Sequence, residues 1–122
     1  MADELHVELV AADRRVWSGD ARIVITRTTE GDIGILPGHQ PVLGILVSAP
    51  VTIRTTDGQE IKAAVQGGFL SVSADTVSIL AEIAELAEEI DIAQAEAELA
   101  QAGDDVEAAR RAETRLRAAG AR

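Results

Sequence analysis

The amino-acid composition of this chain changes sharply near Ala81. Residues 1–81 hold eight of the ten glycines and all three prolines, and their apolar residues are mostly Val, Ile and Leu. Residues 82–122 hold 13 alanines and few large apolar side chains. β-Branched residues suit a pleated, half-buried surface, whereas Ala, Glu, Gln and Arg are good helix formers. The change predicts a β-domain over residues 1–86, followed by a helical region over residues 87–122.

Short apolar runs separated by turn residues fill the first region. Leu5, Val7 and Leu9 alternate with polar residues, which is the period of a half-buried strand. Asp57-Gly58 lies between two such runs and predicts a β-hairpin. The nearly continuous apolar run from Val42 to Ala49 predicts a strand that is buried on both faces. Many short strands at this spacing indicate a β-sandwich or barrel.

Two helices are predicted in the second region. Asp91 can cap the start of the first helix and Gly103 can end it, while Asp104 can cap the second and Gly120 can end that one. The two- or three-residue connection at Gly103-Asp104-Asp105 predicts that the helices form an antiparallel hairpin. The stripes expected to be buried are Ile92, Ala95, Leu99 and Ala102 on the first helix, and Val106, Ala109, Ala112, Leu116 and Ala119 on the second.

The helical hairpin contains few large apolar residues that could stabilise it by burial. Between Ile90 and Arg122 only five residues are large and apolar. Each contributes at most about 1.5–3 kcal/mol when fully buried, whereas ordering the backbone costs roughly 1–2 kcal/mol per residue. The hairpin is therefore expected to depend on docking, and to be able to occupy two arrangements. The alternative is an acidic, Ala-rich tail that frays.

Charge and residue types exclude several functions. The formal net charge is −10, so phosphate backbones and anionic membranes repel the chain and nucleic acid is not an expected partner. There are no cysteines and two histidines, so no metal site is expected. The longest apolar stretch, Val42–Val47, is too short to span a bilayer, and the N-terminus does not resemble a signal peptide. Membrane association is expected only through a partner.

No catalytic constellation emerges from the sequence. His39 lacks the partners of a triad or a metal site, and the acidic residues near Glu85 do not follow the spacing of a calcium loop. A non-catalytic interaction protein is therefore predicted. The alternative is a stand-alone β-sandwich ligand-binding module. The scarcity of aromatic residues argues against it, because a ligand pocket is usually lined by aromatic side chains and the chain has only Trp17 and Phe69.

Five segments follow one another in a specific order: Val16–Asp20, Thr29–Leu43, Val65–Phe69, Val77–Glu82 and Glu88–Asp91. This series closely resembles the epsilon subunit of bacterial F-type, proton-translocating ATP synthases, and the short Ala-rich tail is similar to the actinobacterial form. The resemblance implies a ten-stranded β-sandwich followed by an antiparallel two-helix hairpin.

The resemblance also implies a non-catalytic role. The subunit would sit on the central rotor stalk, bind the gamma subunit and the c-ring, and couple proton translocation to ATP synthesis. It would lie at the cytoplasmic face of the cell membrane as a peripheral part of the complex. In many relatives the hairpin also inhibits ATP hydrolysis by reaching the catalytic alpha and beta subunits in an extended state.

Specific residues are implicated by this resemblance. Glu30 and Asp32 lie in the loop that faces the c-ring in the family, and His39 lies in the matching turn, with a structural or ring-proximal role. Residues 108–122 carry five arginines against one acid. The candidates for an inhibitory helix are Arg110, Arg111, Arg115 and Arg117.

Some relatives bind ATP in the folded hairpin, and this chain matches their motif only in part. The matching residues are Glu85, Ile90, Asp91, Arg111 and Arg115. Gln94 and Gln101 stand where the family has arginines. Each lost guanidinium removes a charge-assisted bond worth about 1.5–3 kcal/mol. No cofactor is therefore expected, and ATP binding is expected to be weak or absent.

Overall fold

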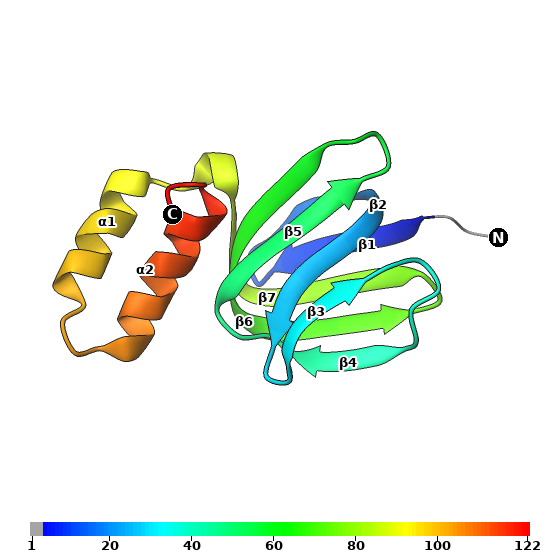
Figure 1. The fold of residues 1–122 in the computed structure, drawn as a ribbon, viewed down its shortest axis with the longest axis horizontal. Helices are drawn as coiled ribbons and strands as arrows, with labels where there is room; N and C mark the ends of the chain where they lie inside the picture. Colours follow the sequence, from blue (N-terminus) through cyan, green and yellow to red (C-terminus); the bar gives the residue numbers. More distant parts are fainter. Residues whose placement is uncertain (1–3) are drawn as a thin grey trace.

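The computed structural model describes residues 4–122, so residues 1–3 of the predicted β-domain lie outside the described part. Seven strands come first: β1 (Leu5–Ala11), β2 (Arg14–Thr28), β3 (Gly31–Ile35), β4 (Val42–Ile45), β5 (Ala49–Thr55), β6 (Glu60–Ser73) and β7 (Thr76–Leu86). One 3-10 turn, η1 (Ala87–Glu89), and two helices, α1 (Ile92–Gln101) and α2 (Val106–Ala118), follow. The helices stand beside one end of the β-sandwich, with α2 nearer to the strands (Figure 1).

The strands form a flattened ring with an extension on each layer. Neighbouring strands follow the order β1-β7-β6-β5-β2-β3, and β1 also pairs with β2, which closes the ring. β4 extends one layer by pairing with β6, and β3 extends the other by pairing with β2. β1 and β7 run parallel, and the other pairs are antiparallel. The predicted β-sandwich followed by two helices is therefore confirmed.

The described residues contain seven strands, so the ten implied by the resemblance are not observed. Long strands that serve both layers account for the lower number. β2 pairs with β1 along Arg14–Ala21 and with β3 and β5 along its second half, and its register shifts between Ala21 and Ile23. β6 likewise pairs with β5 along its first half and with β4 along its second. Each long strand is one element that crosses from one layer to the other.

A glycine pair lets β6 change layers. Gln66 pairs with Ile83 and Gly68 pairs with Ala81, so the ladder skips Gly67. Gly68 has a φ of +113°, and a Cβ atom there would lie 2.1 Å from the carbonyl oxygen of Leu80. Only glycine permits this approach of the two backbones.

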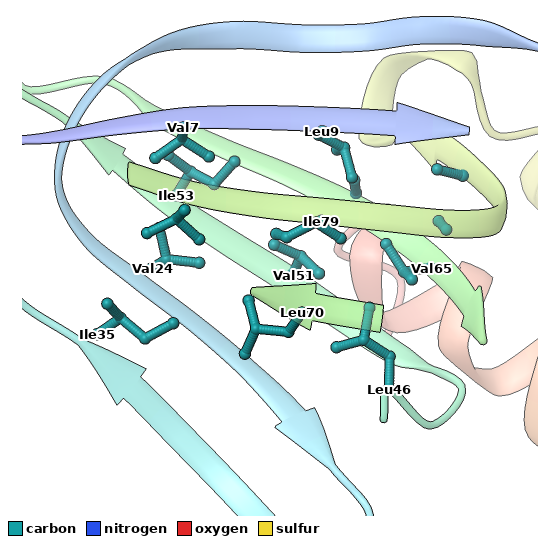
Figure 2. Close-up of a cluster of buried hydrophobic side chains, with 14 of the residues drawn as sticks. Val7, Leu9, Val24, Ile35, Leu46, Val51, Ile53, Val65, Leu70 and Ile79 are labelled. Atoms are coloured by element: carbon teal, nitrogen blue, oxygen red, sulfur yellow. The ribbon is translucent and has the colours of Figure 1, made fainter. Parts of the chain in front are cut away.

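The core lies between the two layers and is built from alternate residues of the strands (Figure 2). Leu5, Val7 and Leu9 are completely buried, which confirms the predicted period of two. The side chains that meet in the centre include Val24, Ile35, Val51, Ile53, Val65, Leu70 and Ile79. The predicted hairpin at Asp57-Gly58 is also confirmed, because it connects β5 to β6 and Gly58 adopts a φ of +88°.

The predicted strand over Val42–Ala49, buried on both faces, is wrong. β4 ends at Ile45, and the side chains of Leu43 and Ile45 are 79% and 55% exposed. The physical reason is that no second layer covers the outer face of β4 among the described residues. Strand β4 therefore carries apolar residues on both faces, although one of these faces is exposed.

The helix boundaries agree with the prediction except at one cap. The Asp91 carboxylate accepts a hydrogen bond from the backbone N–H of Gln94 at 3.0 Å, which confirms the first cap. The second cap is Asp105 and not Asp104, because the Asp105 carboxylate accepts from the N–H of Ala108 at 3.1 Å. The N–H of Asp105 bonds the carbonyl of Ala102, so the connecting turn uses one more residue than predicted.

The buried faces of the helices differ in part from the predicted stripes. Ala95, Ala112 and Leu116 are buried as predicted, whereas Ile92 and Val106 are exposed. The sequence did not reveal that Thr114 and Ala118 are buried. These residues are covered because α2 packs against β5 and β6 as well as against α1, which gives α2 a broader buried face.

Candidate functional site: the docked hairpin and an exposed apolar face

The hairpin docks on the β-sandwich through small side chains. Ile90, which follows η1, packs with Ala64 of β6 and Ala118 of α2. A hydrogen-bonded trio lies on the same side of α2: the hydroxyls of Ser48 and Thr114 are 3.0 Å apart, and Ser48 also bonds the amide of Gln66. We call these six residues the docking interface. The apolar part of the docking interface consists of Ile90 and two alanines, so we expect polar contacts to contribute to docking.

Arg115 of α2 makes the most extensive polar contact between the hairpin and the sandwich. Its Nε and Nη2 atoms donate to the carboxylate of Glu85 on β7 at 2.8 and 3.2 Å. Its Nη1 atom donates to Glu98 of α1 at 2.7 Å, and Nη2 also donates to Gln94 of α1 at 3.2 Å. We call these four residues the Arg115 cluster. A single guanidinium therefore joins α2, α1 and the β-sandwich.

Burial and hydrogen bonding shift the pKa of Arg115 in opposite directions. The side chain is only 12% exposed. This burial acts to lower the pKa of Arg115, but the hydrogen bonds to Glu85 and Glu98 outweigh it, so the pKa lies above its ordinary value. The guanidinium therefore stays charged inside the interface.

A second arginine holds the segment that leads into the hairpin. Arg14, at the start of β2, donates to the Glu89 carboxylate through Nη2 at 2.7 Å and through Nη1 at 3.1 Å. Glu89 also accepts from the backbone N–H of Leu86 at 2.9 Å. The hydrogen bonds from Arg14 and Leu86 lower the pKa of Glu89 below its usual range. This contact fixes η1 against the end of the sandwich nearest the hairpin.

A groove of about 550 Å³ lies between the two helices and the sandwich. Of the residues matched to the ATP-binding motif, Glu85, Arg111 and Arg115 line this groove together. Ile90 and Asp91 do not line it, because Ile90 is buried in the docking interface and Asp91 caps α1.

The charges of this groove disfavour a phosphate group. The two residues that replace family arginines, Gln94 and Gln101, both line it. Three carboxylates, those of Glu85, Glu98 and Asp105, also line it. Arg115 already bonds two of these carboxylates, those of Glu85 and Glu98. Among the described residues that line the groove, Arg111 is therefore the only basic side chain without an ion pair.

The four arginines considered for an inhibitory helix lie on two different sides of α2. Arg111 and Arg115 face the groove just described. Arg110 and Arg117 line a larger cavity, of about 1070 Å³, between α2 and strands β2 and β5. They pair with acids of their own helix, Arg110 with Glu107 at 3.4 Å and Arg117 with Glu113 at 3.6 Å. The docked hairpin does not present all four on one surface.

The hairpin formed by β2 and β3 carries two of the candidate contact residues, with Glu30 in its turn and Asp32 at the second position of β3. Glu30 and Asp32 are both exposed there. Asp32 bonds the Nε atom of Arg27 at 2.6 Å, and this hydrogen bond lowers the pKa of Asp32. Glu30 donates its backbone N–H to the hydroxyl of Thr28 at 3.1 Å. Among the described residues its carboxylate forms no ion pair, whereas that of Asp32 pairs with Arg27.

His39 lies away from these two carboxylates. It belongs to the loop between β3 and β4, which is fixed to the turn between β6 and β7 by the bond from the Gly38 N–H to Asp75 at 2.7 Å. The Nδ1 atom of His39 lies 2.7 Å from the carbonyl oxygen of Gln40. Glu30 precedes β3 and His39 follows it, so the five residues of β3 at about 3.3 Å each, roughly 16 Å, lie between them. The structure therefore does not bring Glu30, Asp32 and His39 into one patch.

One surface that the sequence did not predict is an apolar face on β4, β6 and β7. Ile45 pairs with Phe69, and Phe69 pairs with Leu80, so these three side chains form a row across the sheet. Leu43 lies two residues before Ile45 on the same face, and all four are more than half exposed. We call these four residues the apolar face. The signal in the sequence was the apolar run after Pro41, which has large residues at successive positions.

Among residues 4–122 there is no helix long and apolar enough to cross a bilayer. The same residues contain no group of three or more His, Cys, Asp or Glu side chains placed to hold a metal ion.

Comparison with known proteins identifies the family. Residues 4–87 match the model of the ATP synthase Delta/Epsilon chain, beta-sandwich domain. The chain belongs to this family. Within the family it is similar over its full length to the ATP synthase epsilon chain of Streptomyces avermitilis, with 64% identity over 124 residues that cover 100% of both chains. It is also 60% identical to the ATP synthase epsilon chain of Rhodococcus jostii, over 94% of this chain and 95% of the relative.

Two solved structures share the fold described above. A chain of the Euglena gracilis mitochondrial ATP synthase, solved with OSCP, F1 and the c-ring, matches with a TM-score of 0.69 and 22% identity, over 99% of this chain and 80% of that chain. A chain from the central stalk and c-ring of the Tetrahymena thermophila enzyme gives a TM-score of 0.67 at 19% identity, over 97% and 96%. The predicted membership of the epsilon family and the similarity to its actinobacterial form are both confirmed.

Proposed function

We propose that this chain is a non-catalytic subunit of the central stalk of an F-type ATP synthase. There it binds gamma and the c-ring and couples proton translocation to ATP synthesis. Full-length similarity to epsilon chains of this enzyme supports the assignment. It favours the stalk subunit over the alternative of a stand-alone ligand-binding module. The chain then lies at the cytoplasmic face of the cell membrane, held there by the complex.

The observation that carries this proposal is the apolar face. Soluble monomers rarely leave several large apolar side chains together in water, and such patches mark protein interfaces. Leu43, Ile45, Phe69 and Leu80 are more than half exposed, and each contributes about 1.5–3 kcal/mol when fully covered. They lie in a row on an open sheet face, which suits a protein partner better than a small ligand. We assign the apolar face to the contact with gamma.

The turn between β2 and β3 is our proposed contact with the c-ring. Glu30 is exposed in this turn and Asp32 is exposed at the start of β3, and a negative tip suits polar loops that carry Lys or Arg. His39 lies beyond the opposite end of β3 from this tip. We therefore propose Glu30 and Asp32 for the ring contact and a loop-stabilising role for His39, whose ring bonds the adjacent carbonyl.

Regulation of ATP hydrolysis is the proposed role of the hairpin. In an extended state α2 would bring Arg110, Arg111, Arg115 and Arg117 to acidic surfaces of the catalytic alpha and beta subunits. ATP binding to the docked hairpin is proposed to be weak or absent, because two glutamines replace arginines and three carboxylates line the groove. Calorimetry on the full chain that gives submicromolar ATP affinity would contradict this.

Reconstitution tests the stalk assignment. An ATP synthase depleted of this subunit, in membrane vesicles, should recover ATP-driven proton pumping when the wild-type chain is added. A variant with Leu43→Ser and Phe69→Ser should bind gamma at least tenfold more weakly. A tenfold change in affinity corresponds to about 1.4 kcal/mol of binding free energy. The control is Leu36→Ser, an exposed leucine outside the apolar face. If the double variant binds gamma as tightly as the control does, the apolar face is not the contact.

Hydrolysis measurements test the regulatory role separately. The depleted catalytic core with gamma is titrated with the full chain and with a chain that ends at Glu89. The shorter chain keeps both Arg14 and Glu89, which are in contact in the full chain, but lacks both helices. Inhibition by the full chain alone assigns inhibition to the hairpin. Equal behaviour of two chains that both bind gamma would show that the hairpin does not regulate hydrolysis.

A further inference from the structure

Arg115 is the arginine of α2 that joins the hairpin to the sandwich by charge. Its guanidinium bonds Glu85 of β7 through two nitrogens and Glu98 of α1 through the third. A two-nitrogen contact of this kind fixes orientation as well as distance. The carbonyl of Ala84, one residue before Glu85, accepts a bond from Arg14, so both arginine contacts converge on the end of β7.

The other arginines near the hairpin do not make such a connection. Arg110 and Arg117 pair within α2. Arg122, which follows α2, pairs with Glu96 of α1 at 3.3 Å, so this contact does not involve the sandwich. Arg111 lies one helical turn before Arg115 and lines the same groove, and within residues 4–122 it forms no ion pair. Arg111 is therefore a matched control for Arg115.

The segment between the two arginine contacts is the place where the hairpin can turn. Arg14 holds Glu89, and Arg115 holds α2. Between them Ile90 and Asp91 have extended backbones, with ψ angles of 127° and 100°, and no regular secondary structure. Any movement of the helices away from the sandwich that keeps the contact between Arg14 and Glu89 would have to turn within residues 90–91.

We propose that Arg115 is the positioning residue that fixes the hairpin in its docked place, and that it does so without a bound nucleotide. The protein's own carboxylates, those of Glu85 and Glu98, take the position beside the guanidinium that a phosphate would need. The bearing of this proposal on enzyme regulation rests on the function proposed above, whereas the docking itself is a property of the full chain.

The chemistry of the Arg115 cluster makes the contact both specific and reversible. Glu98 is half exposed and Glu85 is partly exposed, so salt and competing carboxylates have access to the cluster. A lysine cannot reproduce a contact that uses three nitrogens, because its ammonium is a single point charge. A charge-based contact is therefore distinguishable from a merely packed one by its salt dependence and by the graded effect of Arg115→Lys.

Amide hydrogen exchange of the full chain, followed by mass spectrometry, tests the proposal. Exchange in α1 and α2 should be at least about tenfold faster in Arg115→Gln than in the wild type, because bonds to a charged group are lost. Arg115→Lys should lie between the two, and Arg111→Gln should match the wild type. Raising NaCl from about 50 to about 500 mM should accelerate exchange in the wild type but not in Arg115→Gln. Magnesium ATP should leave wild-type exchange unchanged.

Several results would overturn the proposal. Equal exchange in Arg115→Gln and the wild type would do so, as would equal acceleration in Arg111→Gln, or strong protection of the helices by ATP. Amides of β5 and β6 report whether a variant is folded. If Arg115→Gln does not fold, Glu98→Gln replaces it, because Glu98 is half exposed and contacts only the helical side of the cluster. All these measurements use the chain alone, so their failure is distinct from a failure to bind gamma.

Discussion

The hydroxyl oxygens of Ser48 and Thr114 lie 3.0 Å apart, although 66 positions separate these residues in the sequence. Ser48 belongs to the connection between β4 and β5, and Thr114 is buried on α2. The pair thus reports directly on whether the hairpin is docked. Because the chain contains no cysteine, two introduced cysteines would be the only thiols present.

We expect the double variant Ser48→Cys, Thr114→Cys to form an intramolecular disulfide under mild oxidation. The two side-chain oxygens are already in contact, and a disulfide needs Cβ atoms about 3.5–4.5 Å apart. The oxidised chain should not inhibit ATP hydrolysis, and reduction should restore inhibition. The control pair is Ser71→Cys with Thr114→Cys, since Ser71 lies on the far half of β6 beside β4. Retained inhibition by the oxidised chain would show that docking and inhibition are unrelated.

Gly68→Ala should strongly destabilise the sandwich. A Cβ atom at this position would lie 2.1 Å from the Leu80 carbonyl oxygen, and the φ of +113° is unfavourable for alanine. We expect a loss of about 3 kcal/mol or more in the free energy of unfolding, measured with urea. Gly34→Ala is the control, because a Cβ atom at Gly34 would meet no other atom within 4 Å and the φ there is not positive. Similar stability of the two variants would contradict the close approach of β6 and β7.

The two neighbouring aspartates before α2 should behave differently. Asp105→Ala removes the side chain that accepts from the Ala108 N–H and should cost about 0.5–2 kcal/mol of hairpin stability. Asp104→Ala should have almost no effect, because Asp104 does not cap the helix. Hydrogen exchange at the first turn of α2 separates the two outcomes. Equal effects, or a larger effect of Asp104→Ala, would place the cap one residue earlier.

The contact between Arg14 and Glu89 should make stability depend on pH in acid. The pKa of Glu89 is lower in the folded chain than in the unfolded chain, because Arg14 and Leu86 bond its charged form. This contribution is fully present above the unfolded value, about 4.3, and is lost as the pH falls through the lower folded value. The urea midpoint of Arg14→Gln should therefore fall less than that of the wild type between about pH 6 and about pH 3, values that bracket the unfolded pKa.

Arg22→Gln is the control for this measurement, because Arg22 bonds only the carbonyl of Thr56 among the described residues. Its midpoint should follow the wild-type pH dependence. If Arg14→Gln also follows the wild type, the contact seen in the structure does not contribute to stability in solution.

Local sequence was sufficient for the elements whose determinants are local. Alternation identified β1, Asp57-Gly58 identified a hairpin, and Asp91 identified the start of α1. The prediction of Asp104 as the second cap was wrong, because both aspartates can cap and the turn geometry selects Asp105. The ends of both helices at glycine were correctly predicted, since Gly103 and Gly120 adopt positive φ angles.

The functional surfaces depend on contacts that the sequence does not display. The partners of Arg115 lie 30 and 17 positions away, at Glu85 and Glu98, so no local pattern joins them. The run after Pro41 shows that β4 is apolar on both sides, but only the sheet topology shows that one side has no cover among the described residues. Similarly, Glu30 and His39 are near in sequence, yet β3 holds them apart.

The two long strands that pass from one layer to the other have a mechanical consequence. Because β2 and β6 are hydrogen-bonded within both layers, the layers cannot slide past each other without breaking ladder bonds in a shared strand. The closing pair of β1 with β2 removes the remaining way to shear the ring. A twisting load applied at the β2–β3 turn is therefore carried to the apolar face on β4, β6 and β7 by a body that turns as a whole.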